Sequence, residues 1–170
     1  MIKRLVLCVI ATVLFTGVTQ AAELKMGVVD VRAIIANTPQ RETIALALQN
    51  EFKDRGAEMK AMEEEIKGMQ SKGQADAMTM TNQQKTDLVR SIESKVGDFK
   101  LKEKALKEDF KRRNEEEQRK LLILAKKAID QVAMNDKLDI ILQAESVAYI
   151  NQTLDITSKV ITLMSDPKFN

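Results

Sequence analysis

The chain has 170 residues, of which 27 are Lys or Arg, 25 are Asp or Glu, and none is His. Histidine is the usual general base and the commonest metal ligand, so its absence argues against catalytic triads, zinc hydrolases and His-ligated haem. Aromatic residues make up 4% of the chain and charged residues 31%. This composition disfavours one large globular core and favours elongated helices.

The N-terminus has the pattern of a secretory signal peptide. Lys3 and Arg4 precede an apolar run over residues 5–18, and small residues follow where a signal peptidase cuts. The run is shorter than the roughly 20 residues that a membrane-spanning helix needs. We predict that residues 1–21 are cleaved on export, which removes the only cysteine and leaves 25 basic against 25 acidic residues. A periplasmic location fits a chain without disulfides.

Short runs rich in β-branched residues lie near both ends of the mature chain. Three of them are predicted strands: residues 25–31, 138–143 and 147–150, with a turn at 144–146. Residues 155–164 form a closing helix, because their apolar side chains recur at helical spacing. Strands from the two ends must meet, which predicts an α/β association body formed by residues 22–40 and 121–170.

The middle of the chain, residues 41–120, is predicted to be almost wholly helical because it contains no proline. Thr38 is the expected N-cap of its first helix, and Pro39 is expected at the first helical position, where a missing N–H costs nothing. Apolar residues advance by threes and fours, which is the rhythm of a coiled-coil seam.

The apolar residues of this middle region also mirror each other, which predicts an antiparallel hairpin. Six pairs have residue numbers with the same sum of 158: Leu48 and Phe110, Phe52 and Leu106, Met59 and Phe99, Met62 and Val96, Ile66 and Ile92, and Met69 and Val89. The fold point is therefore near residue 79, with the tip at 77–82. Arg55 falls opposite Glu103, where a compensated ion pair is expected.

The predicted fold is thus α+β and mainly α: a small β-rich body for association, with one long antiparallel coiled-coil arm per chain. A short sheet has open edges, and association would cover them, so an oligomer is expected. Four glycines weaken the arm helices, and bending is expected especially toward the tip. They are Gly56, Gly68, Gly73 and Gly97.

No motif for catalysis is present in the sequence. The acidic runs 63–65 and 115–117 consist of consecutive helical residues, whose side chains point about 100° apart and cannot converge on one substrate. Neither a glycine-rich phosphate loop nor a metal-ligand spacing occurs. We therefore expect no enzymatic activity, no cofactor and no metal.

Two features of the arm could bind a partner. Methionines are concentrated in its outer half: Met59, Met62, Met69, Met78 and Met80. Methionine adapts to many shapes, so these residues could contact varied partners, or the first three could only fill the seam. Residues 95–127 hold 12 basic and 7 acidic residues, which is either an ordinary salt-bridged surface or a site for an anionic partner. Nucleic acid is disfavoured by the export signal.

The chain resembles the Skp, or OmpH-like, family of periplasmic seventeen-kilodalton chaperones over the whole mature sequence. The matching residues are Glu51-Phe52-Lys53 with Arg55, Met62-Glu63, Phe99, Arg112-Arg113 with Glu116-Glu117, Lys120-Leu121, Val147-Ala148-Tyr149 and Asp155-Ile156-Thr157. The resemblance implies a trimer in which three helical arms surround a central cavity. It also implies an ATP-independent holdase that keeps unfolded outer-membrane β-barrel proteins soluble until insertion.

The resemblance and the tip pattern together suggest two sets of binding residues. Client proteins are expected to contact Met69, Met78, Met80, Lys85 and Arg90 on the arm and tip. Lipopolysaccharide, or an anionic membrane surface, is expected at Lys102, Arg112 and Arg113. The tip, residues 67–95, carries five basic and three acidic residues, fewer positive charges than the family resemblance implies. The alternative function is a structural coiled-coil adaptor that bridges envelope components.

Overall fold

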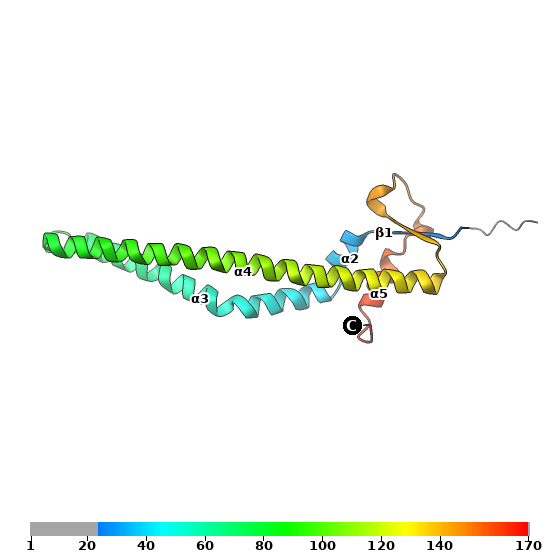
Figure 1. Cartoon of the computed structure of the whole chain (residues 1–170), viewed down its shortest axis with the longest axis horizontal. Coiled ribbons are helices and arrows are strands. Elements are labelled where there is room, and N and C mark those ends of the chain that lie inside the picture. Colours follow the sequence, from blue (N-terminus) through cyan, green and yellow to red (C-terminus); the bar gives the residue numbers. More distant parts are fainter. Residues whose placement is uncertain (1–23, 170) are drawn as a thin grey trace, which may run out of the picture.

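The computed structural model describes residues 24–169, which form a small body and a long helical arm (Figure 1). The predicted signal peptide, residues 1–21, lies outside the described residues. The fold is mainly α-helical with a small strand pair in the body and a helical hairpin as the arm. This confirms the predicted fold class.

Two short strands from opposite ends of the chain join in the body. β1 (Met26–Val29) pairs in parallel with β2 (Ile140–Gln143), with Met26 opposite Ile140 and Val29 opposite Gln143. Both elements fall within the predicted strands, although each is shorter than predicted. The meeting of the two chain ends is therefore confirmed.

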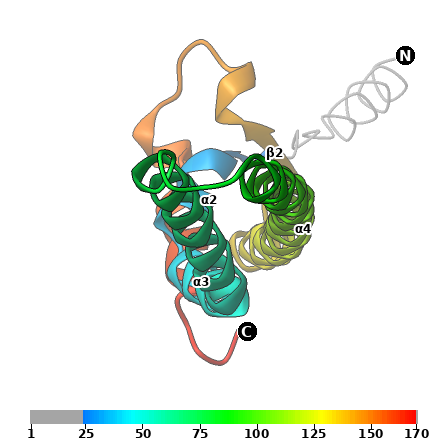
Figure 2. The same cartoon turned by 90° about the vertical axis from the view of Figure 1, so that its left-hand side faces the viewer.

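The predicted third strand, residues 147–150, is wrong: this segment has no strand partner among residues 24–169. It lies between two short 3₁₀ turns, η1 (Ala144–Ser146) and η2 (Gln152–Leu154). The whole excursion projects from the body in both views (Figure 1, Figure 2). Its composition favours a strand, but a strand forms only where a partner edge is available, and β1 makes only an isolated bridge from Val28 to Asp155 on this side.

Helix α2 (Val31–Asn37) follows β1 directly, because Asp30 caps it by accepting a hydrogen bond from the Ala33 backbone N–H at 2.9 Å. Helix α3 then begins at Gln40, with Pro39 rather than Thr38 at the N-cap position. The prediction that Thr38 caps α3 is wrong. Thr38 is buried, is the C-cap of α2, and donates its hydroxyl to the Gln40 side chain.

The core of the body lies between β1, α2, α4 and α5 (Thr157–Met164). Ile34, Val160 and Met164 have the largest fully buried side chains. One stripe of α4 contributes Leu121, Ala125, Ala128 and Val132. Leu122, next to Leu121 on the same helix, is 49% exposed and lies outside this core.

The arm consists of α3 (Gln40–Ala75) and the first half of α4 (Asn82–Asp136), joined by a turn at residues 76–81. This turn contains residue 79, near which the sequence pattern set the fold point. Figure 2 looks along the arm from the tip and shows the two helices side by side. Helix α4 continues past the arm into the body and ends at Asp136, and its C-cap Lys137 is left-handed with a φ of 53°.

The seam between α3 and α4 is one stripe of half-buried side chains at heptad spacing. On α3 it contains Phe52, Met59, Met62, Ile66 and Met69, and on α4 Leu88, Ile92, Val96, Phe99 and Leu106. Leu48, at the body end, is the only fully buried residue of α3. Val89, which the sequence analysis paired with Met69, is 53% exposed. Leu88 occupies the seam position in its stead.

Contacts across the seam join residues with higher numbers than the mirror pairing predicted. Phe52 meets Phe110, with ring centroids 5.3 Å apart, instead of Leu106. Arg55 pairs with Asp109 at 2.8 Å instead of Glu103. In a helix each side chain leans toward the N-terminus, so in an antiparallel pair the two sets lean in opposite directions. For a given residue of α3, the contacting residue of α4 therefore lies closer to the body than the mirror pairing predicted.

The visible bend of the arm lies in the body-side half of α3, while α4 is nearly straight, so the bend is not near the tip as predicted (Figure 1). A Cβ atom added at Gly56 or Gly68 would meet no atom within 4 Å. At Gly73 it would lie 2.7 Å from Leu88 Cδ2, so the glycine there permits close approach of the two helices.

We predict that Gly68→Ala raises the free energy of unfolding by about 0.5–1 kcal/mol, because alanine favours the helix and the site is open. Gly73→Ala should gain less, because the new methyl group displaces Leu88. Urea unfolding followed by circular dichroism measures both. Equal gains at the two positions would contradict the close approach at Gly73.

Candidate functional site

The tip of the arm is an ordered turn. The Asp76 carbonyl accepts hydrogen bonds from the backbone N–H groups of Thr79 and Met80, each at 3.0 Å. A capping box starts α4: the Thr81 hydroxyl accepts from the Gln84 N–H at 3.2 Å, and the Gln84 side chain accepts from the Thr81 N–H at 2.9 Å. The turn therefore holds its side chains on a defined support.

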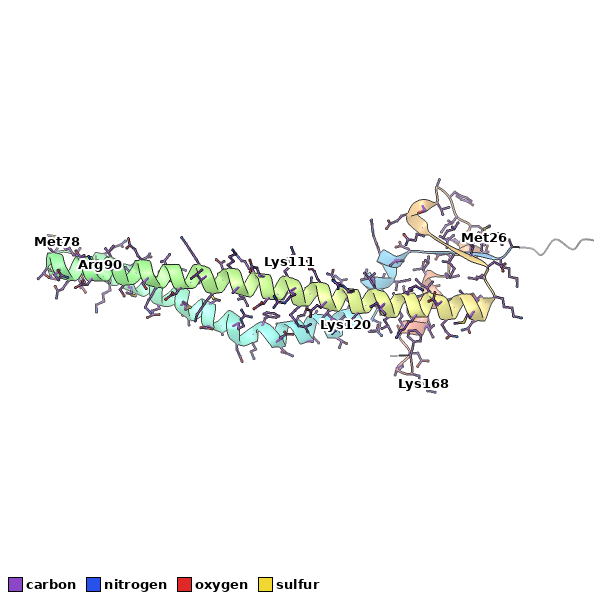
Figure 3. The ribbon with its side chains drawn as sticks, viewed as in Figure 1. Met26, Met78, Arg90, Lys111, Lys120 and Lys168 are labelled. Atoms are coloured by element: carbon purple, nitrogen blue, oxygen red, sulfur yellow. The ribbon has the colours of Figure 1, made fainter. Side chains whose placement is uncertain are left out.

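The predicted client-binding residues occupy different environments. Met78 is 97% exposed at the end of the arm (Figure 3). Lys85 and Arg90 are exposed, and neither makes an ion pair with any residue in 24–169. Met80 is half-buried and Met69 belongs to the seam. The structure thus gathers an exposed methionine and two free cations at the tip, with Met69 set apart from them.

The predicted lipopolysaccharide residues all make ion pairs within the chain. Lys102 pairs with Glu58 across the seam, and Arg112 pairs with Asp109 at 2.6 Å. Arg113 is the most occupied of the three residues. It pairs with Glu51 at 3.0 Å, Glu116 at 2.6 Å and Glu117 at 3.1 Å.

These ion pairs shift the pKa values of the groups involved. Hydrogen bonds from Arg55 and then Arg112 lower the pKa of Asp109, and a hydrogen bond from Lys102 lowers the pKa of Glu58. The Lys120 hydrogen bond is the main cause that lowers the pKa of Glu117. Hydrogen bonds to Glu51, then Glu116 and Glu117, raise the pKa of Arg113. The positive charge of the second helix is thus largely matched by carboxylates.

The acidic runs do not form a chemical site. Glu63, Glu64 and Glu65 point to three different lysines, Lys67, Lys60 and Lys95. Within residues 24–169 no group of three or more His, Cys, Asp or Glu side chains is arranged to hold a metal ion. None of the described helices is both long and apolar enough to span a bilayer.

The sequence analysis missed a groove of about 620 Å³ where the arm leaves the body. Helices α2, α3 and α4 line it with the apolar residues Val31, Ile35, Ile44, Leu48, Leu121 and Leu122. Its polar lining consists of Arg32, Arg41, Asn114 and Gln118. Extending the mirror pairing past Leu48 toward the body would have pointed to this region, because the sum of 158 sets Ile44 opposite Asn114, and both residues line the groove.

The chain matches a family model and several curated proteins. Residues 25–164 match the model "Outer membrane protein (OmpH-like)". The chain is 34% identical over 142 residues to a protein of Pectobacterium atrosepticum, covering 84% of this chain and 86% of the relative. It is 36% identical over 147 residues to a protein of Photorhabdus luminescens, covering 86% and 88%. Both relatives are named chaperone protein Skp.

A solved structure from Caulobacter crescentus, assigned as an OmpH-like outer membrane chaperone, shares the fold with a TM-score of 0.74 at 14% identity. The alignment covers 89% of this chain and 90% of that one. These matches define a class of non-enzymatic chaperones with a helical arm. The chain belongs to the OmpH-like family, and the predictions of family and of a non-enzymatic role are confirmed.

We predict that the arm loses stability below about pH 4.5. The pKa values of Glu58, Asp109 and Glu117 are lower in the folded arm than their usual values of 4.5, 3.8 and 4.5. Their ionised forms therefore favour folding at higher pH, and the contribution disappears as the pH falls through the lowered values. Melting temperatures measured by circular dichroism between pH 7 and pH 2.5 would show the decline.

The variant Asp109→Asn should reduce this pH dependence, since it removes one titrating partner of Arg55 and Arg112. Asp54→Asn is the matched control, because Asp54 makes no ion pair within the described chain. An identical decline in Asp109→Asn and in the control would show that the Asp109 pairs do not contribute.

Proposed function

We propose that this chain is a periplasmic, ATP-independent holdase that keeps unfolded outer-membrane β-barrel proteins soluble until insertion. The observation that carries the proposal is the arm: a slender hairpin in a chaperone family, with Met78 exposed and two unpaired cations at its end. Export depends on the predicted signal peptide, residues 1–21.

The chemistry of the arm suits a client that has no fixed shape. Outer-membrane β-barrel strands alternate apolar and polar residues. Methionine can follow many apolar shapes, and lysine and arginine side chains can pair with scattered carboxylates. Many weak contacts hold such a chain while leaving release possible without a nucleotide.

The proposed assembly is a trimer whose bodies, residues 22–40 and 121–170, associate while the arms, residues 41–120, extend with their tips at 77–82. Exposed apolar residues on the body support association: Ile123, Met134, Ile140, Leu142 and Tyr149. The segment 147–150 has strand composition and lacks a partner, and Val147 is already extended with φ −122° and ψ 126°. A strand edge of another copy would supply that partner.

The test dilutes a urea-unfolded outer-membrane protein into buffer with the mature chain and follows turbidity. We expect suppression at roughly one trimer per client, with static light scattering reporting both the trimer and its complex with the client. Met78→Ser with Met80→Ser should raise the amount needed by about fivefold, the effect of losing about 1 kcal/mol of apolar contact.

Leu46→Ser is the control, because Leu46 is 53% exposed but lies near the body end of α3, far from the tip. A wild-type chain that does not suppress aggregation, and that retains one stable envelope partner instead, would favour the structural adaptor. Equal suppression by the tip variant and the wild type would exclude the tip methionines as client contacts.

Lipopolysaccharide, or another anionic membrane surface, is the second proposed partner, at Lys102, Arg112 and Arg113. Each side chain would have to exchange a carboxylate of this chain for an anionic group of the lipid. Arg112 is 61% exposed and Lys102 52%, whereas Arg113 is 29% exposed and holds three carboxylates. The first two are therefore the accessible part of the proposed site.

We predict that Arg112→Gln weakens lipopolysaccharide binding by about threefold, because an exposed charge contributes only up to about 1 kcal/mol. Arg113→Gln should weaken binding less and destabilise the arm more. Lipopolysaccharide titration followed by fluorescence anisotropy measures binding, and Arg119→Gln is the control, since Arg119 has no ion pair among residues 24–169. Equal binding by all variants would exclude this site.

A further inference from the structure

The groove at the base of the arm is distinct from the tip, and none of Lys102, Arg112 and Arg113 lines it. It is lined by residues of α2, of the first turns of α3 and of α4, at the end of the seam nearest the body. Leu48 and Leu121 form its floor, each 5% exposed, and Leu122 on its wall is 49% exposed. An apolar side chain placed here would cover surface that now faces solvent.

Two amide side chains line the same groove without being used by the fold. Asn114 and Gln118 lie four residues apart on α4, so they share one face of the helix. Neither makes a side-chain hydrogen bond to any part of residues 24–169. A primary amide both donates and accepts, which matches the N–H and C=O groups of a polypeptide backbone.

The charged residues that line the groove are all basic. Arg32 and Arg41 contribute to the lining, and no Asp or Glu of the described part of the chain does. Arg32 is bound to Glu145 at 2.7 Å, whereas the Arg41 guanidinium makes one hydrogen bond within residues 24–169, from Nη1 to the Ala36 carbonyl at 3.2 Å. Four of the five N–H donors of the Arg41 guanidinium are thus left for a carboxylate.

We infer that this groove binds an extended apolar segment of an unfolded polypeptide that carries an acidic side chain beside its apolar residues. The apolar side chain packs on Leu48, Leu121 and Leu122. The client backbone bonds to Asn114 and Gln118, and the acidic side chain pairs with Arg41. The inference rests on the proposed holdase function and gives it a second, sequence-selective contact point.

A polypeptide fits these features better than other occupants do. The acyl chain of a lipid has no hydrogen-bonding groups, so it would leave Asn114 and Gln118 unpaired inside the complex. An unfolded client offers alternating apolar and polar groups in extended form, which matches an apolar floor beside two amides and a cation.

The test measures fluorescence anisotropy of short labelled peptides with the full mature chain. One peptide has a Leu-Val-Phe centre flanked by Asp, and the other has the same centre flanked by Lys. We expect the acidic peptide to bind about tenfold more tightly than the basic one. Arg41→Gln should remove this preference, whereas Arg119→Gln, outside the groove, should keep it.

A second pair of variants tests occupancy of the groove. Ala45→Phe fills the groove from α3, and Ala57→Phe places the same side chain on α3 outside it. Both alanines are exposed, so both variants should fold. Ala45→Phe should weaken binding of the acidic peptide about tenfold, while Ala57→Phe should bind as the wild type does.

Each remaining outcome overturns the inference. These outcomes are no binding by the wild type, equal binding by the two phenylalanine variants, and equal affinity for the two peptides. A change of oligomeric state in Ala45→Phe, measured by light scattering, would instead assign the groove to a contact between copies. Turbidity assays distinguish failure of the groove inference from failure of the proposed holdase function. A holdase that acts only through its tips would still suppress aggregation in Ala45→Phe.

Discussion

The arm depends on a single stripe of contact between α3 and α4. Its side chains are half-buried rather than enclosed, and Leu48 at the body end is the only fully buried residue of α3. Such a seam contributes less apolar burial per residue than a globular core does. Most of the surface of each helix consequently remains exposed to solvent. Exposed methionine and cationic side chains therefore do not remove any residue from the seam.

Ion pairs take over where the seam lacks apolar side chains. Residues 111–120 contain none, and there Arg113 joins Glu51 on α3 to Glu116 and Glu117 on α4. A surface pair contributes little alone, but several charges in one network have a defined geometry. Arg113 and its partners therefore stabilise the arm, and an anionic ligand that binds Arg113 has to compete with these carboxylates.

The hairpin could be predicted because its periodicity is local and mirrored about residue 79, so no partner was needed to see it. The register could not be predicted, since Phe52 meets Phe110 through the opposite lean of side chains, which residue numbers alone do not contain. The segment 147–150 was misassigned because strand composition does not supply a strand partner. Of the candidate sites, the exposed tip followed from the hairpin, whereas the groove depends on how the three helices α2, α3 and α4 meet.

The sheet also sets the order in which the chain assembles. The Lys25 and Asp139 backbones are joined by a 2.8 Å hydrogen bond across 114 positions, whereas contacts near the tip join residues close in sequence. Closing a longer loop costs more entropy, so local contacts form first. During synthesis, which starts at the N-terminus, the arm can form from its turn as soon as both helices have been made. β1 can pair only after β2, near the C-terminus, has been synthesised. The body can therefore be completed only after nearly the whole chain has been synthesised.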